Sequence, residues 1–193
     1  MAERELPPFE SMKGSLLVAM PQMEDAAFQR AVIYLTHHTQ TEGARGIVIN
    51  NPTQKITCRE ILEQLKMPVT EDCSFPPVLI GGPDHRLQGF ILHTPEVFYQ
   101  ETQKITDDIC LTTTQEILGE IALGHKPNQY LVAVGCATWA PSQMEEEIMG
   151  NIWLSVPANK EILFETPYEQ KWEKAISLLG FSANQFAPKA GKA

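Results

Sequence analysis

The sequence predicts an α+β fold in a single compact domain, with a mixed or mostly antiparallel sheet flanked by helices. Two observations support this prediction. The first half of the chain holds apolar, β-branched segments that follow one another closely enough to pair as hairpins. The second half mixes strands with segments whose apolar residues recur at helical spacing, and strands followed by helices in this order are typical of the α+β class.

Short apolar runs bounded by Pro, Gly or Asn define the expected strands. Seven such runs are expected, at residues 15–20, 31–36, 44–50, 77–83, 89–93, 109–112 and 130–139. The second run should pair with the third as a hairpin, and the fourth with the fifth. Residues 94–106 are polar and are expected to be irregular, while residues 151–156 fit either the end of a helix or a strand.

Four helices are expected. The first follows Thr57, because Glu60 stands three residues later as in a capping box and apolar residues recur at helical spacing as far as Leu65. The other three are read from apolar periodicity and end signals: one from Thr113 or Thr114 to near Gly124, one with Pro141 as its first residue, and one over about residues 169–179.

The stretch from Tyr130 to Trp153 is the best candidate for a site, because it predicts a buried strand, a tight turn and a helix start. On that helix, a polar stripe lies at i, i+4 and i+8, beside an apolar stripe of Met144, Ile148 and Ile152 that should face the core. Gln143, Glu147 and Asn151 form the polar stripe. They offer donors, acceptors and a charge to a small polar ligand. The alternative is a solvated helix face with Asn151 capping the helix end.

Other candidate residues lie at strand ends and turns. Backbone N–H groups at Gly81 and Gly82 could hold an anion, or form a plain turn. His93 could line a rim, or be a structural histidine, and Asn50 fits a turn. Trp139 is either a pocket wall or a core residue. The predicted ligand-binding set is Gly81, Gly82, His93, Trp139, Gln143, Glu147, Asn151 and Asn50.

Several chemistries are not predicted. The net charge of −9 disfavours nucleic acid, which Lys and Arg would have to neutralise. The four cysteines form no CxxC motif, so neither a zinc site nor a dithiol motif is indicated. His37 and His38 point to opposite faces of a strand and cannot share one metal ion. Cys136 could act as a nucleophile only beside a histidine. We therefore expect no metal, no cofactor and no assigned catalytic residue.

The ends of the chain read as peripheral segments. Residues 1–13 are expected to be a flexible arm, residues 14–181 the domain, and residues 182–193 a tail. The polar start lacks the apolar core of a secretory signal, and no run reaches the roughly 18 apolar residues of a membrane span. These features predict a cytoplasmic protein with no membrane partner.

Seven segments in order resemble the YqgE/AlgH family of bacterial proteins. They are Gly14–Pro21, Phe28–Leu35, Gly43–Asn50, Gly81–Pro83, Gly89–His93, Trp139–Glu147 and Asn151–Trp153. The resemblance implies a strongly bent sheet and a bacterial cytosolic protein. It also carries the label of a transcriptional regulator linked to alginate production. The family usually has glycine at two positions near this turn, where this chain has Thr138 and Ser142.

The leading functional prediction is a non-enzymatic module that binds a small polar ligand or regulates a protein partner, because candidate pocket residues gather at strand ends and turns. Two alternatives stay open at this point. One is the transcriptional regulator that the family label suggests, although no helix-turn-helix pattern is present. The other is a hydrolase that uses Glu147 or His93 as a general base.

Overall fold

The computed structural model describes residues 9–69 and 74–180. In this part of the chain, one curled sheet of nine strands forms the centre of the domain, in the order β6-β7-β5-β8-β3-β2-β1-β9, with β4 also paired to β8. All pairings are antiparallel except that of β4 with β8. The predicted α+β class and the mostly antiparallel sheet are confirmed.

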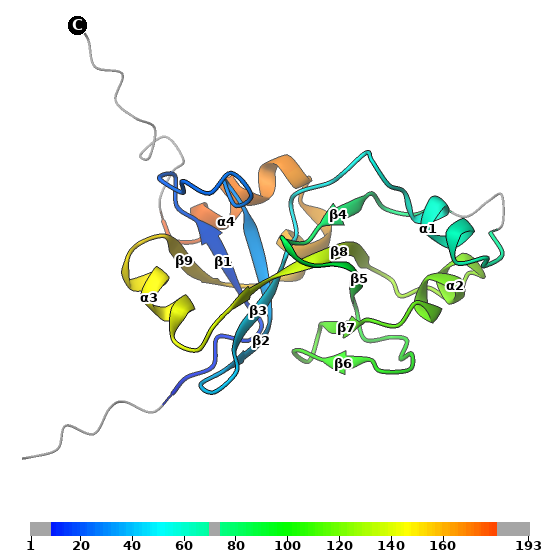
Figure 1. Cartoon of the computed structure of the whole chain (residues 1–193), viewed down its shortest axis with the longest axis horizontal. Coiled ribbons are helices and arrows are strands. Elements are labelled where there is room, and N and C mark those ends of the chain that lie inside the picture. Colours follow the sequence, from blue (N-terminus) through cyan, green and yellow to red (C-terminus); the bar gives the residue numbers. More distant parts are fainter. Residues whose placement is uncertain (1–8, 70–73, 181–193) are drawn as a thin grey trace, which may run out of the picture.

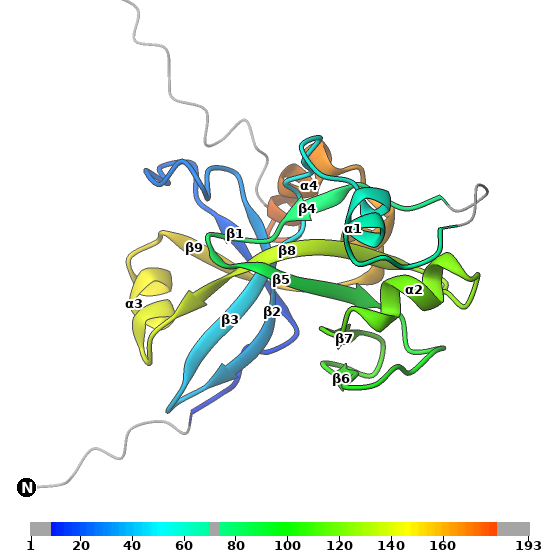
Figure 2. The ribbon, with the colours of Figure 1, turned by 45° about the vertical axis from the view of Figure 1, so that its right-hand side comes forward.

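The strands are β1 Ser15–Ala19, β2 Val32–Thr39, β3 Gly43–Val48, β4 Val78–Ile80, β5 Asp84–His93, β6 Gln103–Lys104, β7 Cys110–Thr112, β8 Tyr130–Trp139 and β9 Trp153–Pro157. The helices are α1 Cys58–Gln64, α2 Glu116–Ala122, α3 Gln143–Met149 and α4 Lys171–Ser177, with a π-helical segment η1 Glu161–Glu165 and a 3-10 turn η2 Tyr168–Gln170. Figures 1 and 2 show α3 beside β9 at one end of the domain and α1 and α2 at the other end.

The central strands are buried on both faces, and their side chains alternate between two clusters. Leu16 and Val18 of β1 belong to the cluster that η1 and α4 cover, together with Trp172. Leu17 and Ala19 point the other way, into the cluster that contains Met144 of α3 and the loop between β1 and β2. This period of two is the geometry of a strand covered on both sides, and it places α3 and α4 on opposite faces of the sheet.

Strand β8 connects the two halves of the sheet. Along one edge it pairs with β5, and along the other it pairs with β4 and then with β3. The predicted hairpin between residues 77–83 and 89–93 is therefore wrong, because β4 and β5 both pair with β8 and not with each other. The predicted hairpin of β2 and β3 is confirmed, but β2 runs on to Thr39, three residues beyond the predicted end of the strand.

The helix start that was predicted from a capping box is correct. Thr57 Oγ1 accepts from the N–H of Glu60, and Glu60 Oε2 accepts from the N–H of Thr57 at 2.7 Å, so the capping box is confirmed. The predicted starts at Thr113 or Thr114 and at Pro141 are wrong. The α2 helix begins at Glu116 after an uncapped Gln115, and α3 begins at Gln143 after Ser142.

Three further boundaries differ from the prediction. Residues 94–106 were expected to be irregular and include the short strand β6, which pairs with β7. The ambiguous segment 151–156 is mainly strand β9, and the last helix is preceded by η2. The expected arm lies partly, and the expected tail wholly, outside the described residues, and residues 9–13 of that arm contact β2 through His38.

Candidate functional site

The carboxylate of Glu147 on α3 connects the end of β8 to the start of β9. Its Oε2 accepts the indole N–H of Trp139 at 2.9 Å and that of Trp153 at 2.7 Å. Its Oε1 accepts from the Gln143 amide at 2.9 Å. All three donors are neutral, and Glu147 is half-buried. Among the described residues, the carboxylate has no positively charged partner.

The two tryptophans are held edge to face, with ring centroids 6.0 Å apart, and Phe28 meets Trp153 in the same way at 5.6 Å. Trp139 and Trp153 are almost wholly buried. Gln143 also accepts the N–H of Ala140 at 3.0 Å, which fixes the turn before α3. Carboxylate, amide and indoles thus form one hydrogen-bonded cluster, in which each position depends on the others.

A cleft of about 550 Å³ opens beside this cluster, between α3, the end of β8, the start of β9 and the loop between β1 and β2. It is lined by Gln22, Met23, Glu24, Asp25, Phe28, Ala137, Thr138, Trp139, Gln143, Glu147, Ile152 and Trp153. Gln22 donates to the backbone carbonyl of Asn151 at 2.8 Å and so joins the two sides. This volume is in the range that small-molecule sites occupy.

The two departures from the family pattern lie at the end of β8 and in the turn that precedes α3. Ser142 adopts a left-handed conformation at φ +67°, which glycine accepts more readily than an L-residue does. Thr138 donates to the Asp84 carboxylate through both its N–H and its hydroxyl, at 3.1 and 2.6 Å. The threonine thus adds a side chain to the cleft wall and ties β8 to the start of β5.

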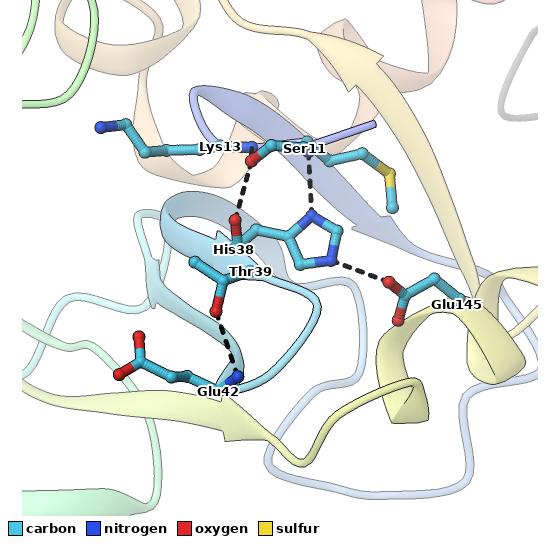
Figure 3. A network of polar contacts seen from close by, with 7 residues as sticks. Ser11, Lys13, His38, Thr39, Glu42 and Glu145 are labelled. Carbon is cyan, nitrogen blue, oxygen red and sulfur yellow. Dashed lines mark hydrogen bonds and ion pairs between the residues drawn. The ribbon is translucent and has the colours of Figure 1, made fainter. Parts of the chain in front are cut away.

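A second contact anchors α3 through Glu145, two residues before Glu147 (Figure 3). His38 Nε2 lies 2.8 Å from Glu145 Oε1, and His38 Nδ1 accepts the N–H of Met12 at 2.9 Å. Since Nδ1 accepts, the proton is on Nε2 and is donated to Glu145. The His38 side chain is 1% exposed. His38 is thus structural, and it links residues 9–13 to α3.

Of the predicted ligand residues, the structure brings together Trp139, Gln143 and Glu147. Asn151 does not continue their stripe, because α3 ends at Met149 and Asn151 follows in a left-handed conformation at φ +55°. Ile152 was expected to face the core and instead lines the cleft, 39% exposed. The C-cap residue of α3 is Gly150, and Asn151 is the residue that follows it.

Asn50 lies apart from the cleft and holds two strands together. Its Oδ1 accepts the N–H of Val32 at 2.8 Å, and its amide donates to the carbonyl of Arg30 at 2.8 Å. These two bonds take the place of backbone pairing where β3 ends. The Asn50 side chain therefore has a structural role, because it binds the backbone at the start of β2.

The Gly81–Gly82 turn serves close packing. The N–H of Gly81 donates to the carbonyl of Val134, and a Cβ on Gly82 would lie 2.2 Å from the backbone of Cys136. Only glycine permits this approach, because Gly82 also has φ +152°. Gly82 lines a different cleft, of about 370 Å³, with Pro83 and Arg86. The expected anion site does not share a cavity with Glu147.

His93 is fully buried and both ring nitrogens have partners. Nδ1 lies 2.8 Å from the carbonyl of Thr94, and Nε2 lies 2.8 Å from Thr112 Oγ1. Burial lowers the pKa of His93, so the neutral ring is favoured. His93 is a core histidine, which leaves the hydrolase prediction without this base in the cleft.

Cysteine and metal chemistry find no support in the described residues. Cys136 is fully buried, and burial raises the pKa of its thiol to about 11. No group of three or more His, Cys, Asp or Glu residues in the described ranges is placed to hold a metal ion. Within the same ranges, no helix has the length and apolar character needed to cross a bilayer.

Sequence reasoning missed the far wall of the cleft. Glu24, Asp25 and Phe28 come from a loop more than a hundred residues before α3, so no local pattern connects them to Glu147. Trp153 carried a usable signal, because tryptophans stand at the end of the strand before α3 and at the start of the strand after it. The His38–Glu145 contact joins residues 107 positions apart and had no such signal.

The fold and site define an α+β domain with a curled, mostly antiparallel sheet and an acidic, aromatic cleft at one end. Comparison with known proteins identifies its family. The AlgH-like family (DUF179) matches residues 16–184, and the chain belongs to it. The resemblance to the YqgE/AlgH family is thereby confirmed.

Curated relatives match over nearly the whole chain. A UPF0301 protein of Pseudoalteromonas translucida is 38% identical over 186 residues, which cover 95% of this chain and 100% of that protein. A UPF0301 protein of Pasteurella multocida is 40% identical over 183 residues, covering 93% and 97%. These names state a family and no reaction.

Two solved structures share the fold. The solution structure of AlgH from Pseudomonas aeruginosa aligns over 100% of both chains, with a TM-score of 0.78 and 34% identity. The crystal structure of DIP2367 from Corynebacterium diphtheriae has a TM-score of 0.65 and 20% identity, covering 88% of this chain and 87% of that one. At that identity the second match shows the fold alone.

Proposed function

We propose that the chain is a non-enzymatic binding module that takes a small cationic ligand with an apolar portion into the Glu147 cleft. One observation carries the proposal: three carboxylates, of Glu24, Asp25 and Glu147, line the cleft, and no Lys, Arg or His is among the described residues that line it. An ammonium or guanidinium group would supply the missing positive charge, and a regulatory role would follow from the occupancy of the cleft.

The burial of Glu147 strengthens this argument. Glu24 and Asp25 are exposed, so water weakens their attraction for a ligand. Glu147 is half-buried, and at a partly desolvated site the attraction between opposite charges exceeds that in bulk water several-fold. Three N–H donors also hold its oxygens in place, so the ligand would not have to order the carboxylate on binding.

The walls of the cleft favour a ligand that carries an apolar group as well as a positive charge. Phe28, Ile152 and the tryptophan pair present apolar surface beside the carboxylate. Such surface favours burial of an alkyl or aryl group, and aromatic rings attract cations as well. A primary amine on a short aromatic or branched aliphatic group matches both features, as does a basic side chain of a peptide.

Binding without catalysis fits the state of the reactive groups in the cleft. Both oxygens of Glu147 accept N–H donors, which reduces its capacity as a general base. The Thr138 hydroxyl and N–H both donate to the Asp84 carboxylate, which ties β8 to β5 and is not among the residues that line the cleft. Among the described lining residues no nucleophile and base are paired.

The test is a titration with phenethylamine, followed by tryptophan fluorescence, which reports on Trp139 and Trp153. We expect a saturable change with phenethylamine and none with phenylacetate, which has the opposite charge. Glu147→Gln should weaken binding at least about tenfold, because it removes the charge and keeps one acceptor oxygen. Glu146→Gln makes the same change on an exposed face of α3 and should bind like wild type. Equal affinities for the amine and the acid would refute the proposal.

A further inference from the structure

Another cavity lies on the opposite face of the sheet and shares no lining residue with the Glu147 cleft. It measures about 190 Å³ and lies between β1, β2, the loop that joins β6 to β7, and the segment before η1. Its lining residues are Gly14, Tyr34, Thr106, Asp108, Ile109, Ala158, Asn159, Lys160 and Leu163. By volume it could hold about six water molecules or one small solute.

Tyr34 of β2 forms the inner wall of this cavity. The side chain is fully buried, and its hydroxyl has no hydrogen-bond partner among the described residues. Burial raises the pKa of Tyr34 to about 12, although the nearby Thr106 side chain acts in the opposite direction, so the phenol keeps its proton at neutral pH. Buried hydroxyls nearly always have a partner, and an unpaired one destabilises the fold.

Gly14 lines the cavity close to this hydroxyl. The residue has φ +87°, and a Cβ at this position would lie 2.6 Å from Thr106 Cγ2 and 3.9 Å from the Tyr34 hydroxyl oxygen. A side chain here would have to displace Thr106 and would reach the cavity beside the phenol. The positive φ and the close Thr106 methyl group therefore both favour glycine at this position.

The remaining polar residues that line the cavity include one basic and one acidic side chain, which form an ion pair. Lys160 Nζ lies 3.0 Å from Asp108 Oδ1, and both side chains are about half exposed, so water weakens this pair and a ligand can replace it. Asn159 is fixed by the bond from the N–H of Ile162 to its Oδ1 at 2.8 Å. The lining thus offers one ammonium, one carboxylate and an unpartnered buried hydroxyl, next to the apolar side chains of Ile109 and Leu163.

We infer that this cavity binds a small zwitterion of the α-amino acid class. The carboxylate of the ligand accepts from the Tyr34 hydroxyl and pairs with Lys160, and its ammonium pairs with Asp108. The apolar wall takes a short side chain, and the volume excludes large ones. A solute with only one of the two charges would leave either Lys160 or Asp108 without a partner in the site.

The test uses ¹⁵N-labelled full-length protein and L-alanine as the probe, titrated to about 20 mM and followed by amide chemical shifts. We expect saturable shifts at Gly14, Thr106 and Lys160 and no shift of the Trp139 indole signal. Acetate and methylammonium, which carry one charge each, should bind at least about tenfold more weakly. No shift at the cavity amides would mean that the cavity holds water only, and would refute the proposal.

Amino-acid substitutions test whether L-alanine binds in this cavity. Tyr34→Phe removes only the unpartnered oxygen, so the fold should persist while affinity falls about tenfold. Tyr99→Phe is the matched control, because its hydroxyl donates to the carbonyl of His125 outside the cavity, and it should bind like wild type. Lys160→Met should also weaken binding without unfolding the chain, since Lys160 is half exposed. Wild-type affinity in both Tyr34→Phe and Lys160→Met would overturn the assignment.

Discussion

Glu147 and Lys171 are two charged side chains that form no ion pair among the described residues, and the protein uses them differently. Lys171 of α4 is 1% exposed, and its Nζ donates to the carbonyls of Ile162 and Leu163 at 2.6 and 2.5 Å. Glu147 accepts from three neutral N–H donors. In both cases the backbone or neutral side chains, and not an opposite charge, hold the ionised group.

The difference lies in what the charge faces. Lys171 is enclosed by η1 and η2, with its Nζ 5.4 Å from the centre of the Tyr168 ring, and it satisfies carbonyls of η1. Glu147 lies at the wall of an open cleft. Lys171 therefore serves the fold alone, whereas Glu147 holds Trp139 and Trp153 in place and also presents its carboxylate to the cleft. Burial in this closed position disfavours the charged ammonium form and lowers the pKa of Lys171 to about 8.

The largest expected effect comes from removing the Glu147 carboxylate. Glu147→Ala leaves two nearly buried indole N–H groups without an acceptor and should lower the free energy of unfolding by about 3 kcal/mol. Glu147→Gln keeps one acceptor oxygen and should lose less than about half of that. Urea unfolding measures both. An alanine variant as stable as wild type would show that the cluster contributes nothing to the fold.

The next effect is the pH dependence of the contribution that Lys171 makes to the free energy of unfolding. The folded-state pKa of Lys171, about 8, lies below the ordinary 10.5, so the unfolded chain binds more protons between these values. The free energy of unfolding contributed by Lys171 therefore rises with pH in that window, by about 2 kcal/mol from about pH 7 to about pH 9.5.

Comparison with Lys171→Met isolates this contribution from other groups that titrate at high pH. The difference in unfolding free energy between wild type and Lys171→Met should grow in favour of wild type as the pH rises. Lys174→Met, on the exposed side of the same helix, is the control for removing a lysine from α4. A constant difference for Lys171→Met would contradict the closed position of its charge.

A smaller effect is expected at the start of α3. Ser142→Gly should raise the free energy of unfolding by about 0.5–1 kcal/mol, because glycine adopts φ +67° without the steric cost of a Cβ. Asn151→Gly is the matched control at φ +55° and should change stability less, since asparagine tolerates this conformation. Thermal unfolding compares the two. Destabilisation by Ser142→Gly would argue against strain at this turn.

The smallest effect is expected at Gln143, which touches the same carboxylate from an exposed position. Gln143→Ala removes a helical i, i+4 hydrogen bond and should cost about 0.5 kcal/mol. Its effect on phenethylamine binding should stay below that of Glu147→Gln, because Gln143 carries no charge. Urea unfolding and fluorescence titration check the two parts. A loss of stability equal to that of Glu147→Ala would show that Gln143, and not Glu147 alone, holds the hydrogen-bonded cluster together.

The sequence predicted features that depend on neighbours along the chain. The Thr57 capping box and the β2–β3 hairpin were correct because their partners lie within a few residues. Trp139, Gln143 and Glu147 were grouped for the same reason, because each is four residues from the next along the chain. These local spacings also supported the family resemblance, which gave the bent sheet.

The errors come from partners far apart in sequence. The separate pairing of β4 and β5 with β8 depends on a strand about fifty residues later, and competition for that strand cannot be read from either segment alone. Likewise, Glu24 and Asp25 become part of the site only through the fold. The acidic character of the cleft, on which the proposed ligand class rests, was therefore not predictable from local pattern.

The central claim is that the unpaired charge of Glu147 makes the cleft a cation site, and a double comparison tests it most directly. Calorimetric titration would measure phenethylamine and its neutral analogue 2-phenylethanol against wild type and Glu147→Gln. The account predicts that wild type prefers the amine at least about tenfold and that the preference falls sharply in the variant. An amine preference that is absent in wild type, or unchanged by the substitution, would contradict the claim.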